Sequence, residues 1–214
     1  MKRESDKGIK NLNTLIKISL LGSMAFLLML FDFPLPIFPS FLKIDLGDLP
    51  ALIGAFALGP VAGVVIEFLK NILYATIKGS STAMVGEVAN FFIGSVLVFI
   101  SGYIYNMKKT RKGAVIGLVV GTIVMSVLAG IINYIVLVPA YAKAFGMPIE
   151  SMVEMGTKIN PNIKDLATLI LWGIIPFNLF KGFAVSFVTA AIYKKIAVVF
   201  QGDTSFKRGL VTRK

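Results

Sequence analysis

One stretch of thirty residues, 113–142, contains no charged side chain, and it limits the possible folds more than any other feature of the sequence. About 20 apolar residues are enough for a helix to cross the roughly 30 Å hydrocarbon core of a bilayer. Three further apolar runs carry a single charge each, namely 14–31 with Lys17, 82–105 with Glu87 and 166–193 with Lys181. The sequence therefore predicts an all-α membrane protein that crosses the bilayer several times.

A fifth apolar block, 49–77, is interrupted by Gly59-Pro60. Proline ends one helix and is well tolerated in the first turn of the next, so we expect two helices in this block. The prediction is then six transmembrane helices, at 14–31, 49–58, 60–77, 82–105, 113–142 and 166–193. They form a single membrane domain, 14–198, between a basic N-terminus, 1–13, and a basic tail, 199–214.

The formal net charge is +11, and its distribution along the chain indicates a membrane topology. With the N-terminus in the cytoplasm, fourteen of the 22 Lys and Arg residues fall in cytoplasmic segments, five in outer segments and three within spans. Cytoplasmic segments of membrane proteins are enriched in these residues. Both termini are therefore predicted to be cytoplasmic. The positive charge then faces the anionic inner leaflet, and no nucleic-acid partner is expected.

The chain contains neither Cys nor His. This composition removes thiolate and imidazole nucleophiles and the commonest ligands of zinc. We therefore expect no metal site, no resident cofactor and no enzymatic activity. The sequence also lacks a GxxxxGK[ST] motif, so any ATP hydrolysis that drives this protein must come from another subunit.

The first outer loop, 32–50, contains four prolines and three phenylalanines together with Lys43, Asp45 and Asp48. Prolines stiffen a loop, and aromatic side chains favour burial over hydration. We expect this loop to fold back over the helices as a lid; a loop that lies against the lipid headgroups is the alternative. In the second outer connection, 143–165, a short helix is expected at 149–156.

Polar side chains within the apolar runs are the candidate functional residues, because such groups are costly in hydrocarbon and usually face a cavity or the bundle interior. Glu87 and Asn90 share one helix face, as do Asn178 and Lys181. In the predicted topology they lie in the outer half of the bundle, under the loop. Asn133, Tyr134 and Tyr141 of the fifth span lie in the same half. This cluster predicts a polar ligand site.

Two structural interpretations of these residues remain open. Asparagines in membrane helices often hydrogen-bond between helices without binding a ligand. Lys181 and Glu87 could form a buried ion pair that fixes the bundle. A second pair, Glu67 and Lys70, lies three residues apart in the third span and is expected to be self-contained and structural.

The stretch FPSFLKIDLGDLPALIGAFALGPVAGVVIEFLKNIL (38–73), followed by IIPFNLFKG (174–182), resembles the riboflavin-specific S component of bacterial energy-coupling factor (ECF) transporters. The resemblance covers nearly the whole chain. It implies that riboflavin, as transported substrate, binds from outside between the first loop and the fourth to sixth helices. By this resemblance the ligand-binding residues are Leu42, Lys43, Asp45, Glu87, Asn90, Asn133, Asn178 and Lys181.

The resemblance also implies partners and a location. An S component docks onto a transmembrane T component that works with two cytoplasmic ATPase subunits, in the bacterial plasma membrane. Ser19-xxx-Ser23 stands where the family has a small-residue AxxxA docking motif, so Ser19, Gly22 and Ser23 are the candidate docking residues. An S component for another vitamin and a stand-alone secondary carrier are the alternative functions.

Overall fold

The computed structural model describes the backbone of residues 2–211 and the side chains of residues 12–193. All basic side chains of the predicted N-terminus, 1–13, and tail, 199–214, therefore lie outside the described residues. Helix α1 (Lys2–Met29) begins within the predicted N-terminal segment, and α9 (Ile175–Val211) continues through most of the predicted tail. The predicted terminal segments are therefore largely helical and continue the first and last helices.

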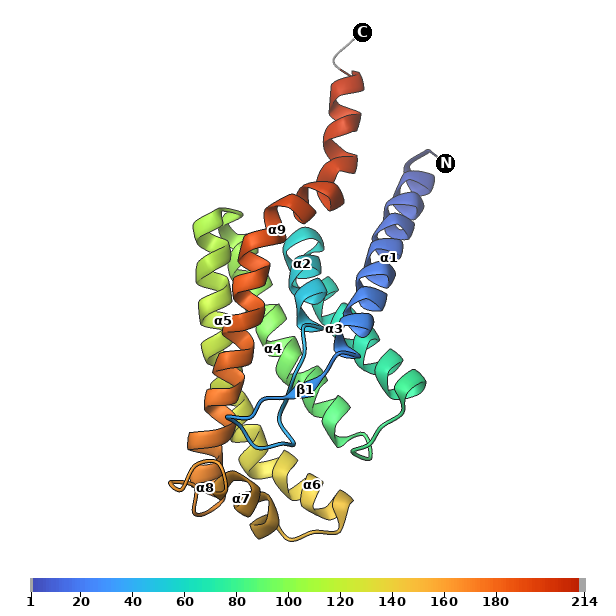
Figure 1. The fold of residues 1–214 in the computed structure, drawn as a ribbon. Coiled ribbons are helices and arrows are strands. Elements are labelled where there is room, and N and C mark those ends of the chain that lie inside the picture. The colour runs from blue at the N-terminus through green and yellow to red at the C-terminus, as the bar shows by residue number, and fades with distance from the viewer. Residues whose placement is uncertain (1, 212–214) are drawn as a thin grey trace.

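Most of the described chain is helical (Figure 1). Between α1 and α9 the elements are β1 (Phe33–Pro34), β2 (Lys43–Ile44), α2 (Asp48–Leu58), α3 (Pro60–Leu73), η1 (Tyr74–Lys78), α4 (Val85–Lys108), α5 (Arg111–Ile132), η2 (Asn133–Leu137), α6 (Val138–Phe145), α7 (Ile149–Thr157), α8 (Leu166–Leu169) and η3 (Ile170–Ile174). The three η elements are π-helical turns. Helix α7 confirms the short helix that was expected at 149–156.

Five helical segments of the described residues are long and apolar enough to cross a membrane, and they correspond to five of the six predicted spans. These segments are Leu12–Met29, Pro60–Lys78, Val85–Lys108, Arg111–Phe145 and Leu166–Tyr193. The start of α1 and the end of α9 lie at the same end of the molecule, opposite α6, α7 and α8 (Figure 1). This arrangement agrees with two termini on one side of the membrane, and the cytoplasmic assignment stays a prediction.

The predicted span 49–58 corresponds to α2, which differs from the other helices in length. Its 11 residues rise about 16 Å, roughly half of the hydrocarbon thickness. Nine of its residues, 48–56, are buried, because α2 packs among α1, α3, α4 and α9. Gly59, with a φ of 110°, ends α2, and Pro60 begins α3, as the Gly-Pro pair predicts. The count of six transmembrane helices stays a prediction.

The first outer loop is more ordered than the sequence suggests. Strands β1 and β2 form an antiparallel pair in which Phe33 lies opposite Ile44 and Pro34 lies opposite Lys43. Phe38 is buried against Phe177 of α9, with ring centroids 5.3 Å apart and planes at 81°. The aromatic side chains of the loop are thus partly buried against the helices, as their composition favours. A lid movement of this loop stays a prediction.

Two of the π-helical turns each end two residues before a proline. Turn η2 ends before Val138-Pro139, and turn η3 ends before Ile175-Pro176. Proline has no N–H for the helical ladder, and its ring clashes with the carbonyl four residues earlier. The wider π turn accommodates both effects, and such turns are frequent at functional sites. Each turn lies next to a candidate asparagine: Asn133 begins η2, and Asn178 follows η3 by four residues.

The close approach of α3 to α2 and α4 predicts a severe packing defect when Gly63 is enlarged. A Cβ at Gly63 would lie 2.4 Å from Val98 Cγ1 and 2.7 Å from Ala55 Cβ. We expect Gly63→Ala to lower the free energy of unfolding by about 1–3 kcal/mol, as overpacking typically does. Thermal unfolding of the detergent-solubilised protein measures the change.

Gly173→Ala is the matched control for this prediction. Its nearest neighbour would be Leu169 Cδ1 at 3.4 Å, which is an ordinary van der Waals contact. We expect wild-type stability for this variant. Equal loss in both variants would contradict the packing explanation.

Candidate functional site

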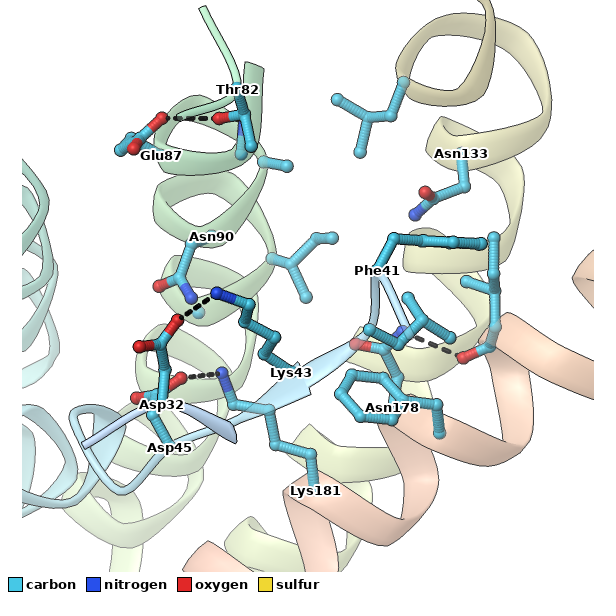
Figure 2. Close-up of a pocket in the computed structure, with 18 of the residues that line it drawn as sticks. Asp32, Phe41, Lys43, Asp45, Thr82, Glu87, Asn90, Asn133, Asn178 and Lys181 are labelled. Carbon is cyan, nitrogen blue, oxygen red and sulfur yellow. Dashed lines mark hydrogen bonds and ion pairs between the residues drawn. The ribbon is translucent and has the colours of Figure 1, made fainter. Parts of the chain in front are cut away.

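A cavity of about 340 Å³ lies between the first outer loop and the helices that carry the polar residues (Figure 2). The end of α1, the loop, α4, η2, α6, η3 and α9 contribute to its wall. All eight sequence-predicted ligand residues line it: Leu42, Lys43, Asp45, Glu87, Asn90, Asn133, Asn178 and Lys181. The structure thus brings together residues that lie as much as 139 positions apart in the sequence.

A buried ion pair joins the loop to α9 at one end of this cavity. The Lys181 ammonium lies 2.9 Å from Asp45 Oδ2, and the two side chains point toward each other in Figure 2. Asp48 Oδ2 lies 3.4 Å from the same ammonium. Lys181 therefore has the loop carboxylates as partners. The alternative interpretation, a Lys181–Glu87 pair, is wrong.

Glu87 is held instead by the segment that precedes α4. Ser80 and Thr82 donate hydrogen bonds to its Oε2, at 2.8 and 3.0 Å. Glu87 lies in the first turn of α4, where the helix dipole favours a negative charge. The segment itself makes a tight reversal, with left-handed φ values of 49° at Ala83 and 69° at Met84. Glu87 thus lines the cavity with a fixed orientation.

The two asparagines on the opposite wall are each oriented by their own helix. Asn133 Nδ2 donates to Ala129 O at 2.8 Å, and Asn178 Nδ2 donates to Ile174 O at 2.9 Å. Both side chains are buried and line the cavity. Asn90 lies across from them on α4 (Figure 2), and within the described part of the chain its buried Oδ1 accepts no hydrogen bond. The cavity therefore offers amide groups from three helical segments.

Apolar side chains complete the wall. Phe41 and Leu42 enter from the loop, and Phe177 enters from α9. Tyr141 and Phe145 of α6 stack with centroids 5.9 Å apart and planes at 8°. A planar apolar ligand with polar edges fits a wall of this kind, because flat surfaces are covered by aromatic and aliphatic groups while amides match the edges.

Asp32 anchors the loop beside the cavity. Its carboxylate lies 3.0 Å from the Lys43 ammonium and 2.7 Å from that of Lys78, and it accepts a hydrogen bond from Tyr74. Burial acts to raise the pKa of Asp32, but the hydrogen bonds from Lys78 and Lys43 outweigh it, so the pKa lies below its ordinary value of 3.8. This cluster of Asp32 with Lys43, Lys78 and Tyr74, here called the Asp32 clamp, therefore contains a charged carboxylate at neutral pH.

Sequence reasoning missed two acids of this site and misjudged one pair. Asp32 and Asp48 both line the cavity. Both lie in the loop 32–50 that also contains Asp45, and this shared loop is the sequence feature that could have identified them. Lys70 lies 2.6 Å from Glu67 but also 2.5 Å from Asp48, so the Glu67–Lys70 pair is not self-contained. The expectation was wrong because Asp48 is carried to Lys70 by tertiary packing.

Two further candidates lie away from the cavity. Tyr134 is about half exposed and lines a separate apolar groove between α5 and η3. Among the docking residues, Ser19 and Ser23 lie on the exposed face of α1, where the Ser23 hydroxyl donates to Ser19 O at 3.0 Å. Gly22 instead packs against Leu69 of α3, which a Cβ would meet at 3.1 Å. The structure separates Gly22 from the two serines.

Among the described side chains, no group of three or more His, Cys, Asp or Glu residues is arranged to hold a metal ion.

A family model for the substrate-specific component of ECF transporters matches residues 13–193. The chain belongs to this family of S components. The family resemblance noted in the sequence is therefore confirmed.

Individual relatives agree with this assignment. The S component is 36% identical over 183 residues to the riboflavin transporter FmnP of Bacillus subtilis strain 168, across 85% of this chain and 90% of that protein. It is 37% identical over 184 residues to the riboflavin transporter RibU of Staphylococcus aureus strain TCH60, across 86% and 89%. A solved structure described as the S component of a bacterial ECF transporter has a TM-score of 0.68 and 32% identity, covering 88% of this chain and 97% of that chain.

These relatives also confirm the broader predictions. They are named as transporters and not as enzymes, and the described part of this chain contains five apolar helices that are long enough to cross a membrane. The S component is a multi-pass protein of a bacterial membrane and acts in transport rather than catalysis.

The Asp32 clamp gives a testable pH dependence. Because the pKa of Asp32 is lower in the folded protein, the clamp contributes its full stability above the ordinary pKa near 3.8 and loses it as the pH falls through the folded value. We expect Asp32→Asn to cost about 1 kcal/mol at neutral pH, since the lysine partners are substantially exposed. Thermal unfolding across acid pH should show the two proteins converging. A difference that persists in strong acid would contradict this explanation.

Proposed function

We propose that this S component binds riboflavin from outside the cell and delivers it inward as the substrate-binding subunit of an ECF transporter. The observation that carries the proposal is the convergence of all eight candidate residues on one cavity of about 340 Å³. Ligand cavities of roughly 300–1,000 Å³ are ordinary for small molecules. Support for the ligand comes from relatives at 36 and 37% identity that are named riboflavin transporters.

The chemistry of the cavity suits riboflavin. The vitamin is uncharged and planar, with a uracil-like edge and a polyhydroxyl tail. Phe41, Leu42 and Phe177 supply apolar surface for the ring plane. Asn133 and Asn178 supply amides for the alternating donors and acceptors of the edge. Lys181 and Glu87 supply charged partners for hydroxyl groups. Lys43, Asp45 and Asn90 complete the polar contacts of the proposed site.

The transport step requires other subunits. The chain contains no P-loop motif, so we infer that a T component and two cytoplasmic ATPases supply the energy. In the proposed orientation both termini are cytoplasmic, the cavity opens outward and loop 32–50 covers it as a lid. The exposed Ser19–Ser23 face of α1 allows another helix to approach closely and is the proposed docking surface.

The proposed ligand and its site are tested by binding measurements on the purified protein. We expect saturable quenching of riboflavin fluorescence by the wild type. Asn178→Ala and Lys181→Ala should each weaken binding about tenfold or more, since each removes a buried polar contact. The matched control is Asn162→Ala, which changes an exposed asparagine outside the cavity.

The outcomes separate the alternatives. If the wild-type protein does not bind riboflavin but another vitamin raises its unfolding temperature, the protein is an S component for that vitamin. If both cavity variants bind like the wild type while riboflavin still binds, the site is misplaced.

The docking surface has its own test. Ser23→Leu places a large side chain on the exposed face of α1, so we expect it to abolish riboflavin uptake by cells while leaving binding unchanged. Ala191→Leu is the control, because it enlarges an exposed alanine on α9. Uptake at wild-type rates by Ser23→Leu would place docking elsewhere. Uptake in cells that lack the T component and ATPases would identify a stand-alone secondary carrier.

A further inference from the structure

Lys70 is fully buried in α3 and does not line the cavity, but its ammonium makes two short contacts with buried carboxylates. Its ammonium lies 2.5 Å from Asp48 Oδ1 and 2.6 Å from Glu67 Oε2, and both carboxylates are almost completely buried. Asp48 lines the cavity, whereas Glu67 does not. The Lys70 side chain therefore contacts the ligand site through Asp48 alone.

Asp48 is shared unequally between two lysines. Its Oδ1 lies 2.5 Å from Lys70, whereas its Oδ2 lies 3.4 Å from Lys181. The close partner of Lys181 is Asp45, at 2.9 Å, and Asp45 is itself fixed by a 2.7 Å hydrogen bond from Gly47 N to its Oδ1. An ammonium has three N–H donors. With one close carboxylate, Lys181 retains donors that can be directed into the cavity.

We propose that Lys70 is a positioning residue of the ligand site: it holds Asp48 back from Lys181 and so keeps the Lys181 ammonium available to the ligand. The ligand part of this inference rests on the proposed function. Without Lys70, the buried Asp48 carboxylate has Lys181 as its remaining cation, because a buried charge must be paired. Asp48 then closes on Lys181 and competes with the ligand for its donors.

The local packing supports a fixed position for Lys70. A Cβ at Gly47 would lie 3.0 Å from Lys70 Cδ and 3.0 Å from Ala25 O, so the lysine stem fills the space beside the residue that directly precedes Asp48. The stem and the two aspartates thus form one packed unit between α1 and α3. A shorter or uncharged side chain at position 70 leaves Asp48 without this support.

The charges of the five groups dictate how the test is designed. Counted by formal charge, Lys70 and Lys181 face three acids, Asp45, Asp48 and Glu67, which leaves one surplus negative charge. Lys70→Met alone would add a second formal negative charge. The double variant Lys70→Met/Glu67→Gln keeps the formal net charge of the wild type and removes the anchor of Asp48. Glu67→Gln alone is the matched control, because it leaves the Lys70–Asp48 contact in place.

The first measurement uses the ligand-free protein. Reductive methylation followed by mass spectrometry reports the reactivity of each lysine, and the exposed Lys158 serves as internal control. We expect Lys181 to be modified several-fold more slowly in the double variant, because two carboxylates then enclose its ammonium. Glu67→Gln and the wild type should react alike. An unchanged Lys181 rate in the folded double variant would overturn the proposal, whatever the ligand is.

The second measurement adds riboflavin and a third substitution. The double variant should bind riboflavin about tenfold more weakly than Glu67→Gln. Adding Asp48→Asn removes the carboxylate that closes on Lys181, so the triple variant should regain most of the affinity. A role limited to fold stability predicts the opposite, since a third buried substitution adds to the damage.

The outcomes of the two measurements are separable. Failure of the triple variant to recover affinity, with thermal unfolding like that of the double variant, would overturn the positioning role. Absence of riboflavin binding by the wild type would refute the proposed function, and the methylation rates would still decide whether Lys70 positions Lys181.

Discussion

The other elements of the site are arranged around the ion pairs that the Asp48 carboxylate makes with two lysines. Asp48 begins α2, lies between the ammonium groups of Lys70 and Lys181, and is 2% exposed. Charges in a low-dielectric interior are stable only when they are paired with good geometry. Asp48 thereby fixes the relative positions of α2, α3 and α9, and it does so at the point where the first outer loop enters the helical bundle.

Because α2 is short, the ion pairs of Asp48 lie beside the cavity. A helix of 11 residues fills only about half of the membrane thickness. Asp48, at the start of α2, and Asp45, just before it, both line the cavity beside the first outer loop. This short buried helix thus places the charges at its N-terminal end beside the cavity, within the proposed ligand site.

The amino-acid sequence predicts part of this arrangement for clear physical reasons. Long apolar runs predict the helices because length and hydropathy are local properties. Glu87, Asn133 and Lys181 predict the cavity because polar groups within apolar spans need an interior position. Sequence reasoning did not find the partner of Lys70, because the Asp48–Lys70 contact depends on how α2 packs on α3. The burial of Gly22 against Leu69 depends on tertiary packing in the same way.

The two sides of the cavity are held by different kinds of contact, and this difference matters for the proposed entry of a ligand. Asn133 and Asn178 are bonded to carbonyls of their own helices, so that wall does not depend on the loop. The loop side is held to the helices by ion pairs, with Asp32 binding Lys78 and Asp45 binding Lys181. If the loop opens, the amides stay in place while Lys181 loses its close carboxylate. Under the proposed lid movement, a ligand that supplies acceptors to Lys181 replaces a contact made by the loop, which would couple capture of the ligand to the position of the loop through one ammonium group.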